Sequence, residues 1–202
     1  MKIVENKIMY HIYSGETLKV GQKIEFGKKF NGMYQRVFED DRKYMGEDTR
    51  EVLSSYAKGK RELEKPQIRE IAGIINDFDF SMRELGLEIA RKEHFPDYPS
   101  RFTCLFVVPT KKECEDWAPR LIWRRKNCQL VKLKLNGKLF CGDSHSNEKA
   151  CDSLNFYINQ GKDYWAGKLS EAPQLEYLFE GTVEVVDIIK VYTEEEGKKY
   201  FK

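Results

Sequence analysis

The middle of the chain constrains the fold most, because it is long, charged and periodic. Two segments within residues 31–95 carry apolar residues at three- and four-residue spacing: RKYMGEDTREVLSSYAKGKRELEK and IREIAGIINDFDFSMRELGLEIARKEHF. This spacing is typical of amphipathic helices, and Pro66 stands where the second helix is expected to begin. The sequence therefore predicts a mostly helical segment over residues 31–95.

The second of these segments has an apolar stripe along one helix face. The stripe consists of Ile68, Ile71, Ile75, Phe78, Met82, Leu85 and Ile89. Such a stripe usually packs into the core of its own protein, and we expect it to do so here. The alternative is a face that contacts a ligand or a protein partner.

The rest of the chain is rich in strand patterns. Strands are predicted at residues 8–13 (IMYHIY), from Phe102 to Val108, on both sides of Asn136-Gly137 as a hairpin, and twice within residues 174–191. Two short helices are expected around KKECEDWAPRLIW and NQGKDYWAG. Because the strands gather in the last region and the long helices mainly precede them, the expected fold class is α+β.

Charge and hydropathy exclude several classes of protein. The 35 basic side chains nearly balance the 33 acidic ones, so no net field directs the whole chain to nucleic acid or to an anionic membrane. No apolar run approaches the roughly 20 residues that cross a bilayer, and the N-terminus lacks the apolar core of a signal peptide. We expect a cytoplasmic protein that forms a single domain over residues 1–202.

Neither disulfides nor a metal site is expected. The cysteines are Cys104, Cys114, Cys128, Cys141 and Cys151. Their number is odd and no CxxC pair occurs, which indicates reduced thiols. The segment GDSHSNEKACD brings Asp143, His145 and Cys151 close in sequence without a recognisable ligand pattern, so we interpret it as a polar loop.

Two ionisable residues interrupt apolar strand patterns. Glu176 stands at the start of a predicted strand, where a carboxylate is usually a solvated edge charge. His11 lies between Tyr10 and Tyr13, where a histidine is more often hydrogen-bonded within a core than catalytic. Taken one at a time, neither residue indicates a function.

The order of three short motifs gives these residues a context. MYHIYS, YPSRFTCLFVV and LFEGTVEVV resemble, in this order, motifs of the ADP-ribosyltransferase superfamily, and in particular of an uncharacterised bacterial branch. The resemblance covers residues 8–14, 98–118 and 173–191. It implies a split, mixed or antiparallel sheet with a helical insertion in the first half. It also implies NAD as substrate, no metal, and transfer of ADP-ribose to a macromolecule.

The same resemblance implies a catalytic pair. Departure of nicotinamide leaves an oxocarbenium-like ribose, whose positive charge a nearby carboxylate stabilises. Glu176 resembles that carboxylate by its place at the start of the strand before Glu180-Gly181. His11 resembles the histidine of the superfamily that hydrogen-bonds the ribose or the nicotinamide.

NAD would contact a second set of side chains. Tyr13, Tyr98 and Phe106 are aromatic residues expected near the nicotinamide, since a flat cation stacks well on a ring; Phe106 departs from the tyrosine often found in the superfamily. Arg101 could bind the pyrophosphate and Ser100 could hydrogen-bond the cofactor. A surface turn explains Arg101 and Ser100 equally well.

Two features bear on the acceptor of ADP-ribose. Gln174 precedes Glu176 by two residues and would share its strand face; in the superfamily, glutamine there accompanies asparagine or guanine acceptors. A basic and aromatic cluster could hold RNA or DNA: Lys111, Lys112, Trp117, Arg120, Trp123, Arg124, Arg125 and Lys126. The alternative for this cluster is a solvated helix face beside two core tryptophans.

Three classes of function stay open. The first is an enzyme that transfers ADP-ribose from NAD to a macromolecule or to water, for which a toxin, a phage-defence or a regulatory role is compatible. The second is a catalytically inactive module of the same fold that binds NAD, nucleic acid or a protein partner. The third is a plain α+β interaction protein. The presence of both His11 and Glu176 favours the enzyme, which predicts that these two residues and Phe106 line one cleft.

Overall fold

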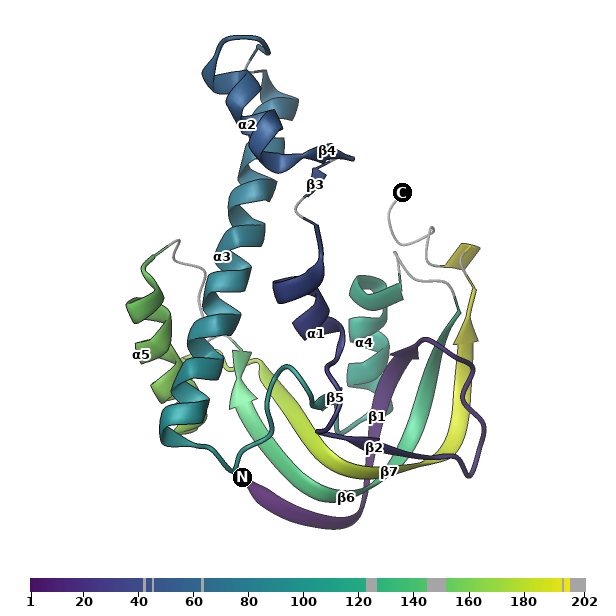
Figure 1. The fold of residues 1–202 in the computed structure, drawn as a ribbon. Helices are drawn as coiled ribbons and strands as arrows, with labels where there is room; N and C mark the ends of the chain where they lie inside the picture. Colours follow the sequence, from purple (N-terminus) through teal and green to yellow (C-terminus); the bar gives the residue numbers. More distant parts are fainter. Residues whose placement is uncertain are drawn as a thin grey trace. The chain divides into compact units, whose positions relative to one another are not determined.

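The chain folds into two compact units, each assembled from segments that are distant in sequence (Figure 1). The computed structural model describes residues 1–41, 43–44, 46–62, 64–122, 127–144, 152–193 and 195–196. The sheet unit comprises residues 1–31, 97–142 and 174–202, and the helical unit comprises residues 32–96 and 143–173. Helices together with a mainly antiparallel sheet agree with the predicted α+β class.

The helical unit contains the long helix that the sequence predicts. Its elements are α1 (Gly32–Tyr34), the π-helical turn η1 (Gln35–Glu39), β3 (Lys43–Tyr44), β4 (Glu47–Asp48), α2 (Thr49–Ala57), α3 (Lys65–His94) and α5 (Leu154–Trp165). Pro66 lies in the first turn of α3, as expected. Asp48 caps α2 by accepting hydrogen bonds from the backbone N–H groups of Arg50 and Glu51. Within the described ranges, no helix combines the length and the apolar character needed to cross a membrane.

Helices α3 and α5 approach each other closely because each carries a glycine at the contact. A Cβ atom at Gly86 would lie 2.6 Å from the Cβ atom of Tyr157, and one at Gly161 would lie 2.8 Å from that of Ala90. The indole N–H of Trp165 donates to the backbone carbonyl of Leu87 over 2.8 Å. The α3 and α5 backbones therefore pack at a distance that a larger side chain would prevent.

The prediction that the apolar stripe of α3 packs into the core is wrong for four of its seven residues, whereas Ile71 packs against the cluster shared with α2 and Leu85 and Ile89 are half-buried. Four residues in the stripe are exposed to solvent, by 58% for Ile68, 49% for Ile75, 51% for Phe78 and 40% for Met82. The helix instead buries Ile74 beside α2, and Leu87 and Ala90 beside α5. The reason is tertiary: the neighbouring elements occupy other sides of the helix, which a periodic pattern by itself does not specify.

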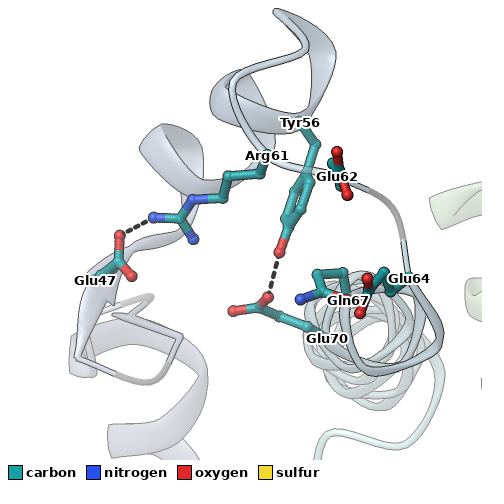
Figure 2. A pocket seen from close by; sticks show the side chains of 7 residues that line it. All are labelled: Glu47, Tyr56, Arg61, Glu62, Glu64, Gln67 and Glu70. Atoms are coloured by element: carbon teal, nitrogen blue, oxygen red, sulfur yellow. Dashed lines mark hydrogen bonds and ion pairs between the residues drawn. The ribbon is translucent and has the colours of Figure 1, made fainter.

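Helix α2 joins α3 through a small apolar cluster of Val52, Tyr56 and Ile74. The phenol of Tyr56 also donates a 2.7 Å hydrogen bond to Glu70 on α3, as Figure 2 shows. This hydrogen bond is the first cause of the raised pKa of Tyr56, because the neutral phenol is the form that donates to the carboxylate.

The sheet unit is built on five strands. They are β1 (Lys2–Ser14), β2 (Lys23–Phe26), β5 (Leu105–Val107), β6 (Cys128–Asp143) and β7 (Leu175–Tyr192). The order is β1-β6-β7-β2, and β5 also pairs with β7. The pairs β1–β6, β2–β7 and β5–β7 are antiparallel. In Figure 1, β6 and β7 run the length of the sheet as strongly curved strands.

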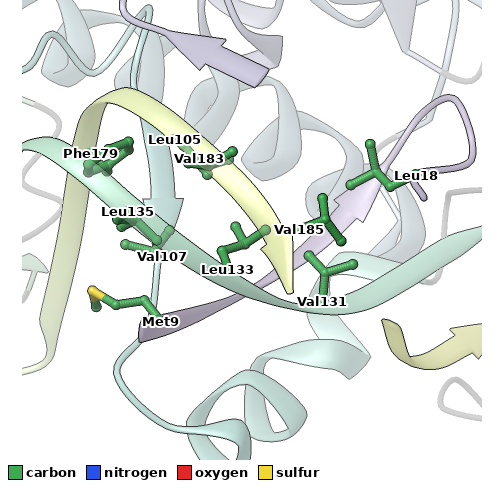
Figure 3. Packing of buried hydrophobic residues seen from close by; sticks show 10 residues of the cluster. All are labelled: Met9, Leu18, Leu105, Val107, Val131, Leu133, Leu135, Phe179, Val183 and Val185. Carbon is green, nitrogen blue, oxygen red and sulfur yellow. The ribbon is translucent and has the colours of Figure 1, made fainter. Parts of the chain in front are cut away.

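The curled sheet closes on itself where β5 ends. Tyr10 of β1 and Val108 exchange two backbone hydrogen bonds of 2.8 and 2.9 Å. Strands β1, β6, β7 and β5 are thereby joined in a ring. Side chains of these strands form the main core together with Leu18 from the loop after β1, as drawn in Figure 3: Met9, Leu18, Leu105, Val107, Val131, Leu133, Leu135, Phe179, Val183 and Val185.

Two predicted turns are instead bends within long strands. The predicted hairpin at Asn136-Gly137 lies inside β6, and the predicted break at Glu180-Gly181 lies inside β7. A Cβ atom at Gly137 would lie 2.3 Å from the carbonyl oxygen of Glu180. The glycines are therefore required where the β6 and β7 backbones come close, rather than at chain reversals.

Helix α4 (Lys111–Ile122) covers a second, smaller core. Cys114, Ala118 and Ile122 pack there with Ile12, Cys128, Leu130 and Tyr192. Both this helix and α5 confirm the two short helices predicted from the sequence. Burial raises the pKa of the Cys114 thiol to about 12. The four described cysteines, which leave out Cys151, are thiols as expected.

Candidate functional site

An ion pair connects the loop before β5 to the start of β7. Arg101 donates from Nη1 to Oε1 of Glu176 over 2.5 Å, and the two side chains are only 6% and 17% exposed. Both residues therefore lie largely out of solvent, where Coulomb attraction is stronger than at the surface. The interpretation of Glu176 as a solvated edge charge is wrong for this reason.

The loop that carries Arg101 is held by backbone hydrogen bonds. The side-chain amide of Asn31 donates to the carbonyl oxygens of Arg101 and Cys104, each over 2.9 Å. Within the loop, the carbonyl of Ser100 accepts from the N–H groups of Thr103 and Cys104. The hydroxyl oxygen of Ser100 accepts from the N–H of Phe102 over 3.2 Å. Ser100 thus builds the turn that presents Arg101.

His11 is fixed by the strand beside it. Its Nδ1 lies 2.7 Å from the carbonyl oxygen of Phe106. A carbonyl can only accept, so Nδ1 carries the proton that is donated, and in a neutral ring Nε2 is then a hydrogen-bond acceptor. The contact exists because the Tyr10–Val108 bridge brings β5 against β1. The ring of Tyr13 lies edge-on to His11, with centroids 6.3 Å apart.

Phe106 links the histidine to the ion pair. The guanidinium carbon of Arg101 lies 5.3 Å from the centre of the Phe106 ring, within the range of a cation–π contact. His11, Phe106, Arg101 and Glu176 are thus joined by consecutive contacts, although they come from three distant parts of the chain. The structure brings together the predicted catalytic pair, His11 and Glu176, with Phe106 and Arg101 of the predicted NAD-binding set.

Other predicted residues are placed differently. Tyr98 packs its ring against Phe140 of β6, with centroids 5.3 Å apart. Gln174 is half-buried and precedes β7, which begins at Leu175, so strand alternation does not by itself put Gln174 on the face of Glu176. Asp143 is buried and accepts a 2.7 Å hydrogen bond from the backbone N–H of Ser170, which is a structural role.

Part of the predicted acceptor cluster lies outside the described residues. This applies to Trp123, Arg124, Arg125 and Lys126, to the side chain of Arg120, and to His145 and Cys151 of the polar loop. Lys111 on α4 is exposed and forms a 3.4 Å ion pair with Glu115. In the ranges that are described, no three His, Cys, Asp or Glu side chains gather as a metal site would require.

Two residues beside the contacts of Arg101 and Glu176 could not be predicted from the sequence. Asn31 occurs in a loop with no motif, and only its hydrogen bonds in the folded chain show that it shapes the Arg101 loop. Tyr177 follows Glu176 on β7, and burial is the main cause that raises its pKa to about 12, with a smaller contribution from Cys141. Tyr177 is therefore a neutral phenol at physiological pH.

A pocket in the helical unit is strongly acidic (Figure 2). It is lined by Glu47, Tyr56, Arg61, Glu62, Glu64, Gln67 and Glu70, and Arg61 forms an ion pair with Glu47. Four carboxylates against one guanidinium disfavour the negative pyrophosphate of a dinucleotide. The residues expected to bind NAD do not line this pocket.

Comparison with known proteins gives a family without an assigned activity. A family model described as "Protein of unknown function (DUF2441)" matches residues 9–191. No curated protein matches the chain.

Proposed function

The chain belongs to the DUF2441 family, and we propose that it is an NAD-dependent ADP-ribosyltransferase whose reacting site is the cluster of His11, Phe106, Arg101 and Glu176. The observation that supports this most is that Glu176, Phe106 and His11, which come from three distant parts of the chain, are joined by consecutive contacts. A carboxylate that is held in one position and largely shielded from water is suited to stabilise positive charge that develops beside it.

The fold proposal is more specific than α+β. We expect the curled sheet to be of the ADP-ribosyltransferase type. In support, the three motifs that carry the resemblance contribute to β1, to β5 and the loop before it, and to β7. Strand β5 pairs with β7 and is bridged to β1, so the motifs adjoin in the sheet unit although they are about 90 and 70 residues apart in sequence.

The proposed reaction breaks the bond between C1′ of the ribose and the nitrogen of nicotinamide. The bonding electron pair leaves with nicotinamide, which becomes neutral, and the ribose acquires oxocarbenium character. Glu176 stabilises that charge electrostatically. A nucleophile on the acceptor then forms a bond to C1′, and its proton passes to solvent water.

His11 and Arg101 would orient the reactants. With its Nδ1 proton donated to Phe106, a neutral His11 offers Nε2 to a ribose hydroxyl. The contact of Arg101 with Glu176 favours a positioning role for the arginine, which differs from the pyrophosphate contact expected from the sequence. The Phe106 ring would provide the apolar surface for nicotinamide.

The proposed acceptor is a nucleobase or an amide side chain rather than arginine. Gln174 supports this choice through the resemblance, and Arg124, Arg125 and Lys126 would supply phosphate contacts if the acceptor is RNA or DNA. Replacing the three cations together should then weaken modification and flatten its salt dependence, because fewer counterions are displaced on binding. Recovery of labelled ADP-ribose on arginine would contradict this choice.

One observation favours a second candidate. The charge of Glu176 is balanced by Arg101, and a carboxylate so balanced stabilises a nearby cation less than an unbalanced one. An inactive module that binds NAD or nucleic acid would keep this pair for stability alone.

Incubation with NAD separates the two candidates. NAD labelled in its adenylate part is mixed with the protein and a cell lysate, and the products are digested separately with nuclease and with protease. Labelled macromolecules and released nicotinamide support the transferase, and the digestion that frees the label identifies the acceptor class. NAD binding without nicotinamide release would support the inactive module.

A further inference from the structure

The loop of Arg101 is held along its length by the short segment that follows β2. Each of the four backbone carbonyls of residues 101–104 accepts a hydrogen bond from residues 27–31. The side-chain amide of Asn31 donates to the first and the last of these carbonyls, each over 2.9 Å, and its backbone N–H donates to the second over 2.8 Å. The third accepts from the N–H of Gly27 over 3.1 Å. Asn31 therefore supplies three of the four donors.

This segment is anchored to the strand that carries Glu176. It follows β2 directly, and β2 pairs with β7. Gly27 also packs against Glu180 of β7, since a Cβ atom at Gly27 would lie 2.2 Å from the Cγ atom of Glu180. The strands β7 and β2, the segment and the Arg101 loop thus form a closed circuit, which returns to β7 through the ion pair of Arg101 with Glu176. Asn31 lies in the circuit that fixes where the guanidinium meets the carboxylate.

The side-chain contacts of Asn31 require an amide. A primary amide nitrogen carries two N–H donors, and here they donate to two carbonyl oxygens of one loop. An aspartate has the same shape, but its ionised carboxylate only accepts, so it would deprive both carbonyls of these donors and repel them. Asparagine at this position therefore sets the path of the backbone at Arg101, from which the guanidinium reaches Glu176.

We propose that Asn31 is a positioning residue of the NAD cleavage proposed above, because it holds the Arg101 backbone at the place from which the guanidinium orients Glu176. The inference rests on that proposed function. A displacement of about 1 Å at a reacting group can cost about a hundredfold in rate, so Asn31→Asp should lower nicotinamide release at saturating NAD by about 10- to 100-fold. NAD affinity should stay within about threefold, since stacking and pyrophosphate contacts do not depend on the orientation of this carboxylate.

Asn136→Asp is the matched control, because the same substitution there keeps the contact that the side chain makes. The side-chain oxygen of Asn136 on β6 accepts a 2.8 Å hydrogen bond from the backbone N–H of Asn6, and a carboxylate can accept it as well. Nicotinamide release, NAD affinity and melting temperature are measured on the wild type and both variants. Release should fall in Asn31→Asp and stay near the wild-type value in Asn136→Asp. If Asn31→Asp fails to fold, Asn31→Ala replaces it, since alanine removes both side-chain donors without adding a charge.

A second measurement follows the ion pair without any turnover. The coupling between Arg101 and Glu176 is obtained from urea unfolding of the wild type, Arg101→Met, Glu176→Gln and the double variant, and again with Asn31→Asp in all four proteins. If Asn31 positions Arg101, the coupling in the second set should fall to less than about half of that in the first. A residue that only stabilises the loop would lower the stability of all four proteins alike and leave the coupling unchanged.

The proposal is overturned if a folded Asn31 variant turns over like the wild type, if Asn136→Asp loses as much activity, or if the coupling is unchanged. A wild type that releases no nicotinamide contradicts the proposed function instead. The coupling then decides by itself whether Asn31 positions the ion pair: a fall supports that placement, and an unchanged value overturns it.

Discussion

Arg101 and Glu176, 75 residues apart in sequence, share a 2.5 Å charge-assisted hydrogen bond in the largely buried part of the sheet unit. Hydrogen bonds between ionised groups are shorter and stronger than neutral ones. The pair fixes the loop before β5 against the start of β7, and it determines how each partner should respond to substitution.

Replacing Glu176 with glutamine should abolish most NAD cleavage while preserving the fold. The amide oxygen can still accept from Arg101, but the charge that stabilises the developing cation is lost. We expect nicotinamide release to fall by about two to three powers of ten, and NAD affinity to stay within about tenfold. Turnover, NAD affinity and melting temperature are measured on the same preparations.

Glu180→Gln is the matched control for this substitution. Glu180 is a half-buried glutamate on the same strand, and its conversion to glutamine should leave nicotinamide release near the wild-type value. Full turnover in a folded Glu176→Gln protein would move the carboxylate role to another residue, with Glu180 and Glu184 the next candidates.

The two members of the ion pair should be energetically coupled. Arg101→Met leaves a partly buried carboxylate without its guanidinium, and Glu176→Gln leaves a buried guanidinium without its carboxylate. The double variant removes both charges, so it should be less destabilised than the sum of the single variants by about 0.5 to 3 kcal/mol. Urea unfolding of the four proteins provides the values. Strict additivity would mean that the pair contributes no interaction energy.

Gly86→Ala should destabilise the helical unit. Alanine normally favours a helix interior over glycine by about 0.5 to 1 kcal/mol, but a Cβ atom here would collide with Tyr157 of α5. Because both helix backbones would have to move apart, we expect a net loss of about 1 to 3 kcal/mol. Thermal unfolding of the wild type and of Gly86→Ala measures this loss of stability. Gly32→Ala, at a position with open space around it, should change stability by less than about 0.5 kcal/mol.

Cysteine labelling should follow burial. The Cys114 thiol has a pKa of about 12 through burial, and the thiolate is the form that alkylating reagents attack, so Cys114 should stay unmodified at pH 8. Cys141 is exposed and should be the first of the four described cysteines to react with iodoacetamide. Peptide mapping by mass spectrometry identifies the modified residues. Equal labelling of Cys114 and Cys141 in the native protein would contradict the burial of α4 against the sheet.

The local pattern predicted α3, α4 and α5 well, and predicted strand pairing poorly. Apolar periodicity and Pro66 placed α3, because helix hydrogen bonds are local and the apolar period reports the helix directly. The sequence predicts turns at Gly137 and Gly181, whereas in the structure each glycine allows a close approach of β6 and β7. A glycine indicates only that a side chain is not tolerated, and the neighbour that excludes it is distant in sequence.

For the candidate site too, the sequence predicts some features and only the folded structure shows the others. The sequence by itself determined which residue types are available: a carboxylate at the start of one strand, a histidine within another, and an aromatic residue with an arginine before it. Only the tertiary structure decided that Arg101 holds Glu176, that His11 donates to Phe106, and that Asn31 supports the loop. It also left Ile68, Ile75, Phe78 and Met82 of α3 exposed where the apolar period indicated core positions. Periodicity arises from contacts between residues near in the chain, whereas partners and burial depend on which distant segments pack together, and these are set by the free energy of the whole fold.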